Sequence, residues 1–192
     1  MTKAKMGKIR IIGGQWRGRK LPVIDRPGLR PTGDRARETL FNWLGSRIID
    51  ARCLDLFAGT GALGFEAASR GAREVVLVEK DRALAESLRA ITAAWPGSEV
   101  VRVEHADALS WITNKPEPFD IVFIDPPFGL DLQSDVLERV GCLLKPDALV
   151  YLESAHDQAS DHGERFETVR IKKQGQVMLQ LLRQQKPERE AL

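Results

Sequence analysis

The chain is poor in cysteine and histidine. Its 192 residues include two cysteines, Cys53 and Cys142, and three histidines. Each cysteine adjoins apolar residues, so we expect two buried thiols in a reducing compartment rather than a disulfide pair. The cysteines and the scattered histidines give no metal-ligand spacing, so no metal site is expected.

Long apolar runs are also missing. No stretch approaches the roughly 20 apolar residues that a membrane span needs. The N-terminal lysines are not followed by the apolar segment of a secretory signal. We therefore expect a cytoplasmic protein that does not contact a membrane. The length suits one domain with an appendage, and 43% apolar residues suffice for a core.

The net charge of +2 conceals a strong asymmetry along the chain. Residues 1–37 carry eleven Lys or Arg and two Asp or Glu, a net of +9. Residues 38–192 carry eighteen and twenty-five, a net of −7. A basic arm on an acidic body indicates contact with a polyanion. We expect a solvated tail over residues 1–8 only, because apolar and aromatic residues interleave with the charges after it.

The N-terminal arm contains two short β-prone runs on either side of Gly13-Gly14, a pair typical of hairpin turns. We predict a β-hairpin that packs on the body or is ordered by a partner, because an isolated hairpin is marginal in water. A proline-containing loop follows it. The sequence thus divides into a basic extension (1–28), a main domain (29–184) and a frayed tail (185–192).

From residue 51 onward, apolar strands alternate with amphipathic helices, which predicts a doubly wound α/β sheet. Only three residues around Gly175 separate the last two strands, so these must form an antiparallel hairpin. The expected fold is a seven-stranded Rossmann-like sheet with an antiparallel last strand, plus the N-terminal hairpin. The predicted strands are 52–57, 74–79, 99–103, 119–125, 147–153, 166–172 and 176–183. The predicted helices are 34–44, 62–70, 81–94, 107–113 and 131–141.

A glycine turn links the first of these strands to the next helix. The spacing Gly59-x-Gly61-x-x-Gly64 permits a tight turn and close backbone approach to a ligand at the strand's carboxyl end. Dinucleotide-binding enzymes share this spacing, so the glycines alone leave a nicotinamide enzyme open. Asp55 favours S-adenosylmethionine instead, because a carboxylate can meet its cationic amino-acid end but would repel a pyrophosphate.

Two further acids follow the next two predicted strands. Glu79 can accept hydrogen bonds from both ribose hydroxyls of the cofactor. Nicotinamide enzymes use an acid in the same way, and an acid at a solvated strand end with no ligand is an equally good interpretation. Asp107 can meet the adenine amino group, cap the next helix, or do both. The candidate cofactor-binding residues are Asp55, Phe57, Gly59, Thr60, Gly61, Glu79, Asp107 and Ala108.

The most specific motif is Asp125-Pro126-Pro127-Phe128, at the end of an apolar strand. The two prolines stiffen the turn and leave carbonyl oxygens near Pro126 free to face a cleft. The Asp125 carboxylate and the Pro126 carbonyl can accept both N–H bonds of a base's exocyclic amine and aim its lone pair at the sulfonium methyl. Phe128 can stack on a flipped base. A rigid loop with a buried aromatic is the structural alternative.

The sequence lacks the residues that other methylation reactions require. Carbon-5 methylation of pyrimidines needs a cysteine nucleophile, and neither Cys53 nor Cys142 follows a proline at a strand end. Asp125 argues against a protein glutamine methyltransferase, whose loop usually begins with asparagine. Nothing in the sequence suggests a Ser-His-Asp triad.

Taken together, the glycine turn, the Asp-Pro-Pro-Phe loop and the segments 11–22 and 29–44 resemble the RsmD-type bacterial ribosomal RNA methyltransferases over residues 9 to about 183. The N-terminal segments narrow the match, because many amino-methyltransferases share the other two motifs. The resemblance implies methyl transfer from S-adenosylmethionine to a guanine N2 amine of 16S ribosomal RNA, in the assembled or assembling small subunit. We expect the enzyme to be a monomer.

The basic arm agrees with an RNA substrate. Its exposed cations can contact phosphates, and Trp16 can stack on a base or, equally, pin the hairpin to the body. Arg37 is expected at the cleft entrance, or paired with an acid at the end of its helix. The candidate RNA-binding residues are Arg10, Trp16, Arg17, Arg19, Lys20, Arg30, Arg35 and Arg37.

Alternatives with the same fold stay open. A DNA or other RNA amino-methyltransferase, acting on adenine N6 or cytosine N4, shares the catalytic loop, but such DNA enzymes commonly carry a separate recognition domain for which little sequence is left. A non-catalytic RNA-binding module is disfavoured by the intact Asp125 and Phe128. A nicotinamide enzyme does not account for the proline loop.

Overall fold

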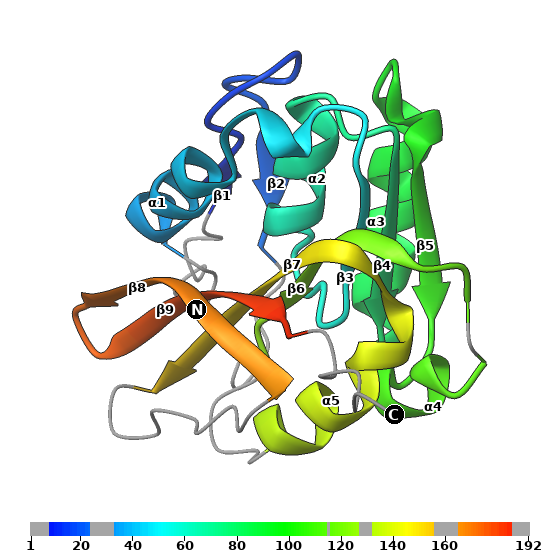
Figure 1. The fold of residues 1–192 in the computed structure, drawn as a ribbon. Coiled ribbons are helices and arrows are strands. Elements are labelled where there is room, and N and C mark those ends of the chain that lie inside the picture. The colour runs from blue at the N-terminus through cyan, green and yellow to red at the C-terminus, as the bar shows by residue number, and fades with distance from the viewer. Residues whose placement is uncertain (1–7, 24–32, 115, 127–131, 156–164, 186–192) are drawn as a thin grey trace, which may run out of the picture.

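Seven strands form the central sheet, in the order β5-β4-β3-β6-β7-β9-β8 (Figure 1). The computed structural model describes residues 8–23, 33–114, 116–126, 132–155 and 165–185. β3 to β7 pair in parallel, whereas β9 runs antiparallel to both β7 and β8, so the predicted fold class is confirmed. The strands are β3 (Arg52–Asp55), β4 (Glu74–Glu79), β5 (Val101–His105), β6 (Phe119–Ile124), β7 (Leu144–Ala155), β8 (Phe166–Gln174) and β9 (Val177–Gln184).

Helices connect the parallel strands and cover both faces of the sheet (Figure 1). They are α1 (Asp34–Leu44), α2 (Ala62–Ser69), α3 (Arg82–Ala94), α4 (Ala108–Ile112) and α5 (Gln133–Val140), with short 3-10 turns at Gly45–Ile48, Ser98–Val100 and Gly141–Leu143. The strand predicted from residue 99 begins at 101 instead, because the Ser98 hydroxyl bonds the carbonyls of Thr92 and Trp95 and holds a turn there. Among the described residues, no helix has the length and apolar character that crossing a bilayer requires.

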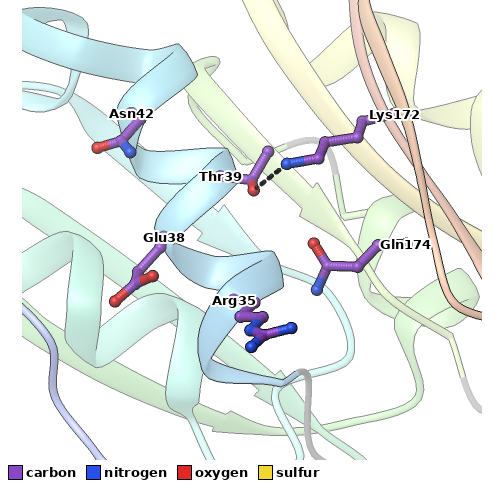
Figure 2. A pocket seen from close by; sticks show the side chains of 6 residues that line it. All are labelled: Arg35, Glu38, Thr39, Asn42, Lys172 and Gln174. Carbon is purple, nitrogen blue, oxygen red and sulfur yellow. Dashed lines mark hydrogen bonds between the residues drawn. The ribbon is translucent and has the colours of Figure 1, made fainter.

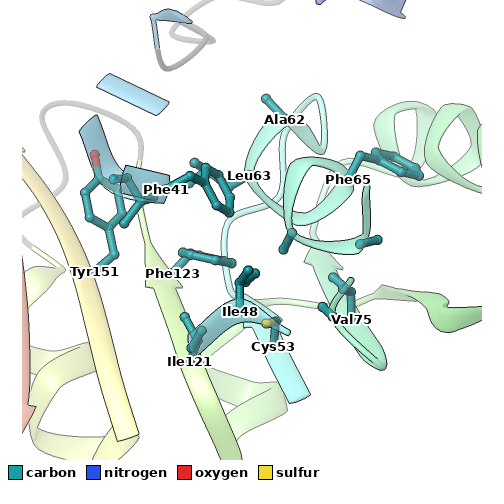
Figure 3. Packing of buried hydrophobic residues seen from close by; sticks show 14 of the residues in the cluster. Phe41, Ile48, Cys53, Ala62, Leu63, Phe65, Val75, Ile121, Phe123 and Tyr151 are labelled. Atoms are coloured by element: carbon teal, nitrogen blue, oxygen red, sulfur yellow. The ribbon is translucent and has the colours of Figure 1, made fainter. Parts of the chain in front are cut away.

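Two apolar clusters, one on each face, make up the core. On one face, Phe41 of α1 packs near Phe123 of β6, with ring centroids 6.1 Å apart, and Tyr151 of β7 lies beside them (Figure 3). α4 and α5 cover the other face. Burial on both sides explains why these strands read as continuous apolar runs. Cys53 belongs to this core, but the prediction that Cys142 is buried is wrong, because it lies exposed in the 3-10 turn after α5.

The N-terminal segment pairs two short strands, β1 (Lys8–Arg10) and β2 (Lys20–Pro22). The predicted tight turn at Gly13-Gly14 is wrong, because residues 11–19 form a longer loop that lies against α2. Gly14 has a φ of +74°, and a Cβ there would lie 1.8 Å from the Ser69 carbonyl oxygen. The glycine pair is therefore needed for close packing of the loop on α2 rather than for reversing the chain.

Glu66 of α2 joins this segment to the main domain. Its carboxylate is fully buried and accepts the backbone N–H of Ile12 at 2.7 Å and of Gly13 at 2.8 Å. It also pairs with Arg37 of α1 at 3.4 Å and with Arg70 at 2.7 Å. One buried acid therefore holds the N-terminal loop, α1 and α2 together.

We predict that Glu66→Ala lowers the free energy of unfolding by about 3 kcal/mol or more, because it leaves two backbone amides without their acceptor and removes one of the two acids that pair with the buried Arg37 guanidinium. Urea denaturation measures the change. Glu86→Ala is the matched control, since it removes the exposed pair between Arg82 and Glu86, which solvent screens, and should change stability far less. Equal losses in the two variants would contradict the role given to Glu66.

Candidate functional site

Three of the predicted site acids end neighbouring parallel strands and share one face of the sheet. Asp55 of β3 pairs with Leu77 of β4 and with Phe123 of β6. Glu79 and Asp125 each follow two residues later, so side-chain alternation places them on the same face, one step closer to the carboxyl edge. The structure thus brings Asp55, Glu79 and Asp125 to one edge of the sheet.

The turn between β3 and α2 also lies at this edge. Gly59 and Gly61 have φ values of +53° and +76°, a left-handed conformation that favours glycine. Glu79 fixes the turn, because one of its oxygens accepts the Gly59 N–H at 2.7 Å and the other accepts the Asp81 N–H at 2.7 Å. Thr60 is buried within the turn.

Asp55 is the most deeply buried of these acids, at 1% exposed. One carboxylate oxygen accepts the Gly64 N–H at 3.1 Å, and the other has no hydrogen-bond partner among the described residues. Burial, followed by the charge of Asp125, raises the pKa of Asp55 to about 7. A cationic ligand fits this environment, because it would supply the missing donor and favour the ionised carboxylate.

Asp107 is exposed and caps α4, accepting the Ser110 N–H at 3.1 Å. The prediction that Asp107 caps the next helix is therefore confirmed. Its neighbour Ala108 is buried, and Phe57 is partly buried against the second apolar cluster. Contact of Asp107 with an adenine stays a prediction.

The catalytic motif is described in part. Asp125 is half-buried and Pro126 is buried, whereas Pro127 and Phe128 lie outside the described residues. Asp125 follows β6, which lies between β3 and β7 in the sheet, and its charge raises the pKa of both Asp55 and Tyr151. Asp125 therefore stands between the buried acid of β3 and the buried phenol of β7.

β7 contributes two residues that the sequence analysis did not select. Tyr151 pairs with Phe123, so Glu153 lies level with Asp125 on the neighbouring strand. The Tyr151 hydroxyl donates to Glu153 at 2.9 Å, and Glu153 is only 7% exposed. Burial raises the pKa of Tyr151 well above its ordinary value, and the charge of Glu153 adds to this, so the phenol remains a donor. The sequence does contain a signal for Glu153, because this acid ends an apolar strand just as Asp55 and Asp125 do.

The predicted RNA-binding residues separate into exposed and buried groups. Arg10, Arg17, Arg19 and Lys20 are exposed on the N-terminal segment, and Arg35 is exposed on α1. Arg30 lies outside the described residues.

The prediction that Trp16 can stack on RNA is corrected by its burial. It is 2% exposed and packs edge-on against Phe65 and Trp95, with ring centroids 6.1 and 5.4 Å away. Its indole N–H donates to the Pro96 carbonyl at 3.0 Å. The structure therefore confirms the other interpretation of Trp16, that it holds the N-terminal segment against the body, here at α2 and α3.

The predicted RNA contact of Arg37 is corrected in the same way. Its side chain is 0% exposed, and besides Glu66 it bonds Asp34 at 2.7 Å and the Arg10 carbonyl at 2.8 Å. Pairing with acids, the alternative reading, makes Arg37 a structural residue that connects α1 to the N-terminal segment.

An open groove of about 430 Å³ lies between α1 and β8 (Figure 2). Arg35 and Thr39 face it from α1, and Lys172 and Gln174 face it from β8. The Lys172 ammonium lies 3.3 Å from the Thr39 hydroxyl. The full lining is Arg35, Glu38, Thr39, Asn42, Lys172 and Gln174.

Within the part of the chain that is described, no group of three or more His, Cys, Asp or Glu side chains could hold a metal ion.

The strand order and the reversed β9 place the protein in the class of Rossmann-like methyltransferases. A solved structure with S-adenosylhomocysteine bound shares this fold, with a TM-score of 0.65 at 17% identity over 81% of this chain and 50% of that chain.

The family follows from closer matches. A family model described as "Conserved hypothetical protein 95" matches residues 9–183. Ribosomal RNA small subunit methyltransferase D of Escherichia coli is 54% identical over 77% of this chain and 75% of its own length. The Haemophilus influenzae protein of the same name is 42% identical over 94% and 96%. The solved structure of Escherichia coli yhhF has a TM-score of 0.85 at 44% identity, covering 93% of this chain and 98% of that one. The chain belongs to this family, and the predicted RsmD-type membership is confirmed.

We predict that Asp55 makes the protein less stable as the pH rises from 5 to 8. Its pKa is about 7 in the folded protein, against an ordinary value of 3.8, so between these values the folded state binds more protons than the unfolded state. Asp55→Asn removes this titration, so its stability relative to the wild type should rise by roughly 2 kcal/mol over that range. Urea denaturation at several pH values tests this, and parallel curves for the two proteins would refute it.

Proposed function

We propose that the protein transfers the methyl group of S-adenosylmethionine to the exocyclic N2 amine of a guanine in the 16S ribosomal RNA of the small subunit. The observation that carries the proposal is the convergence of Asp55, Glu79 and Asp125 on one face of the sheet, beside the Gly59–Gly61 turn. The names of the relatives, ribosomal RNA small subunit methyltransferases, support S-adenosylmethionine as methyl donor and ribosomal RNA as substrate.

The cofactor would lie along this edge of the sheet. Asp55 would meet its cationic amino-acid end, and Glu79 would accept ribose hydroxyls with the lone pairs that its backbone bonds leave. The turn formed by Gly59, Thr60 and Gly61, with Phe57 before it, would line the middle of the site. Asp107 and Ala108 would border the adenine. When bound, the cofactor supplies an electrophilic methyl group on a sulfonium.

The residues of the chain orient the base amine. The Asp125 carboxylate and the Pro126 carbonyl accept its two N–H bonds, so the nitrogen lone pair points toward the methyl group. The two acceptors would stabilise the positive charge that develops on the nitrogen as the new N–C bond replaces the S–C bond of the donor, and the Asp125 carboxylate would accept the released proton and pass it to water. Pro127 would restrict the backbone of the motif, and Phe128 would stack on the base after it leaves its helix.

Two basic regions would hold the RNA. The first is the N-terminal segment, with Arg10, Arg17, Arg19 and Lys20 exposed and Arg30 following it in the chain. The second is the groove between α1 and β8, which contains Arg35 and Lys172.

The groove lies on the same face as the reactive edge. Glu153 pairs with Leu179 of β9, and Leu179 pairs with Lys172 of β8. The Lys172 backbone therefore lies two strand spacings, about 10 Å, from that of Glu153. A phosphate of a nucleotide flanking the flipped base can reach the groove from there, so the groove fits an RNA backbone.

The proposed function is tested with tritium-labelled S-adenosylmethionine. The wild-type protein is incubated with small ribosomal subunits from cells that lack this enzyme, with free 16S RNA and with DNA, and the products are digested to nucleosides. We expect label in N2-methylguanosine from the small subunits. Label in an adenine or cytosine nucleoside, or in DNA alone, would overturn the assignment.

In the same assay, Asp125→Ala should reduce transfer by at least about 100-fold, because it removes an acceptor that acts as charge develops on the amine. Calorimetric affinity for S-adenosylhomocysteine should change little, because Glu79 holds the glycine turn through the Gly59 N–H and is unaltered in this variant. Turnover at the wild-type rate would refute the acceptor role, and loss of cofactor affinity would assign Asp125 to the cofactor instead.

Lys172→Gln tests whether the groove contacts RNA. Lys173→Gln is the matched control, because Lys173 is also exposed but lies on the opposite face of the same strand. If Lys172 contacts a phosphate, its loss weakens subunit binding and lowers the slope of log affinity against log salt by about 1. The Lys173 variant should keep the wild-type slope. Identical slopes for all three proteins would remove the groove from the RNA path.

A further inference from the structure

Glu153 lies level with Asp125 on the adjacent parallel strand, beside the bend that holds the target amine. We propose that Glu153 makes the enzyme specific for guanine by accepting the N1–H of the base whose N2 amine is held by Asp125. This inference rests on the proposed function and adds to it the group that selects the base.

The chemistry of the three amino-bearing bases supports this choice. In guanine the N2 amine adjoins N1–H, so two neighbouring positions are both donors. In adenine and cytosine the exocyclic amine adjoins a ring nitrogen that carries a lone pair and accepts. An ionised carboxylate only accepts, so beside the target amine it complements guanine and opposes the lone pair of the other two.

The geometry of β6 and β7 supplies the required spacing. Backbones of neighbouring strands lie about 4.8 Å apart, so the carboxylates of Asp125 and Glu153 can reach adjacent atoms on one edge of a ring. Side-chain alternation from Phe123 and Tyr151 places both acids on the face that also carries Asp55. Asp125 alone, next to a proline bend, does not distinguish guanine from adenine, because both present two amine hydrogens.

Tyr151 is the positioning residue for Glu153. Its ring is fully buried beside Phe41 and Phe123, and its hydroxyl donates to one Glu153 oxygen at 2.9 Å (Figure 3). A carboxylate has about four acceptor positions, so a hydrogen bond from the phenol fixes its direction without using all of them.

The test compares guanine with 2-aminopurine, which keeps the 2-amino group but has an acceptor at N1. Small subunits are reconstituted with either base at the nucleotide that the wild-type enzyme methylates, mapped beforehand. Wild-type protein should prefer guanine by at least about tenfold in kcat/KM. Glu153→Gln should reduce or reverse that preference, because its amide can donate to the N1 lone pair of 2-aminopurine. Tyr151→Phe should reduce it by less.

Glu99→Gln, the same substitution at an exposed position, should keep the wild-type preference. Affinity for S-adenosylhomocysteine verifies that each variant is folded. An unchanged guanine to 2-aminopurine ratio in Glu153→Gln overturns the inference, as do equal rates on the two bases with the wild type, a measurement that needs no variant. Failure of the wild type to methylate guanine in any RNA would instead overturn the proposed function.

Discussion

The parallel pairing of β4, β3, β6 and β7 is the constraint on which the site depends. Its register brings Glu79, Asp55, Asp125 and Glu153 to one face of the carboxyl edge. A slip of one residue in any pair would turn that strand's acid to the opposite face. Such a slip would also disrupt the core, because both faces of these strands are buried and the apolar residues before each acid would have to exchange the two clusters in which they pack.

A second constraint joins the basic N-terminal segment to this sheet. Glu66 binds the backbone of residues 12 and 13, and Trp16 packs against both Phe65 and Trp95. The exposed cations Arg17 and Arg19 therefore extend from a segment anchored in the core. Because the folded protein already orders this segment, RNA binding has a smaller cost in conformational entropy than it would have with a loose basic tail.

The buried acids oppose folding in the absence of a ligand. Asp55 has a pKa raised to about 7 and one oxygen without a hydrogen-bond partner among the described residues. Groups of this kind are destabilising where they serve only structure, and they are found where a ligand completes them. A cationic cofactor would both satisfy Asp55 and favour its ionised form, so binding and stability should be linked at this position.

The sequence by itself determined the elements and the motifs governed by local backbone chemistry. The glycine turn at Gly59 and Gly61 follows from the conformations that glycine allows, and apolar periodicity sets the strands and helices. Only the tertiary structure decided what depends on distant partners. Trp16 and Arg37 suit an RNA surface in sequence, yet both are buried, because Trp16 packs on Phe65 and Trp95 and Arg37 pairs with Glu66 of α2. Glu153 becomes part of the site only because β7 pairs with β6, and pairing between strands is a property of the folded sheet, to which local sequence contributes little.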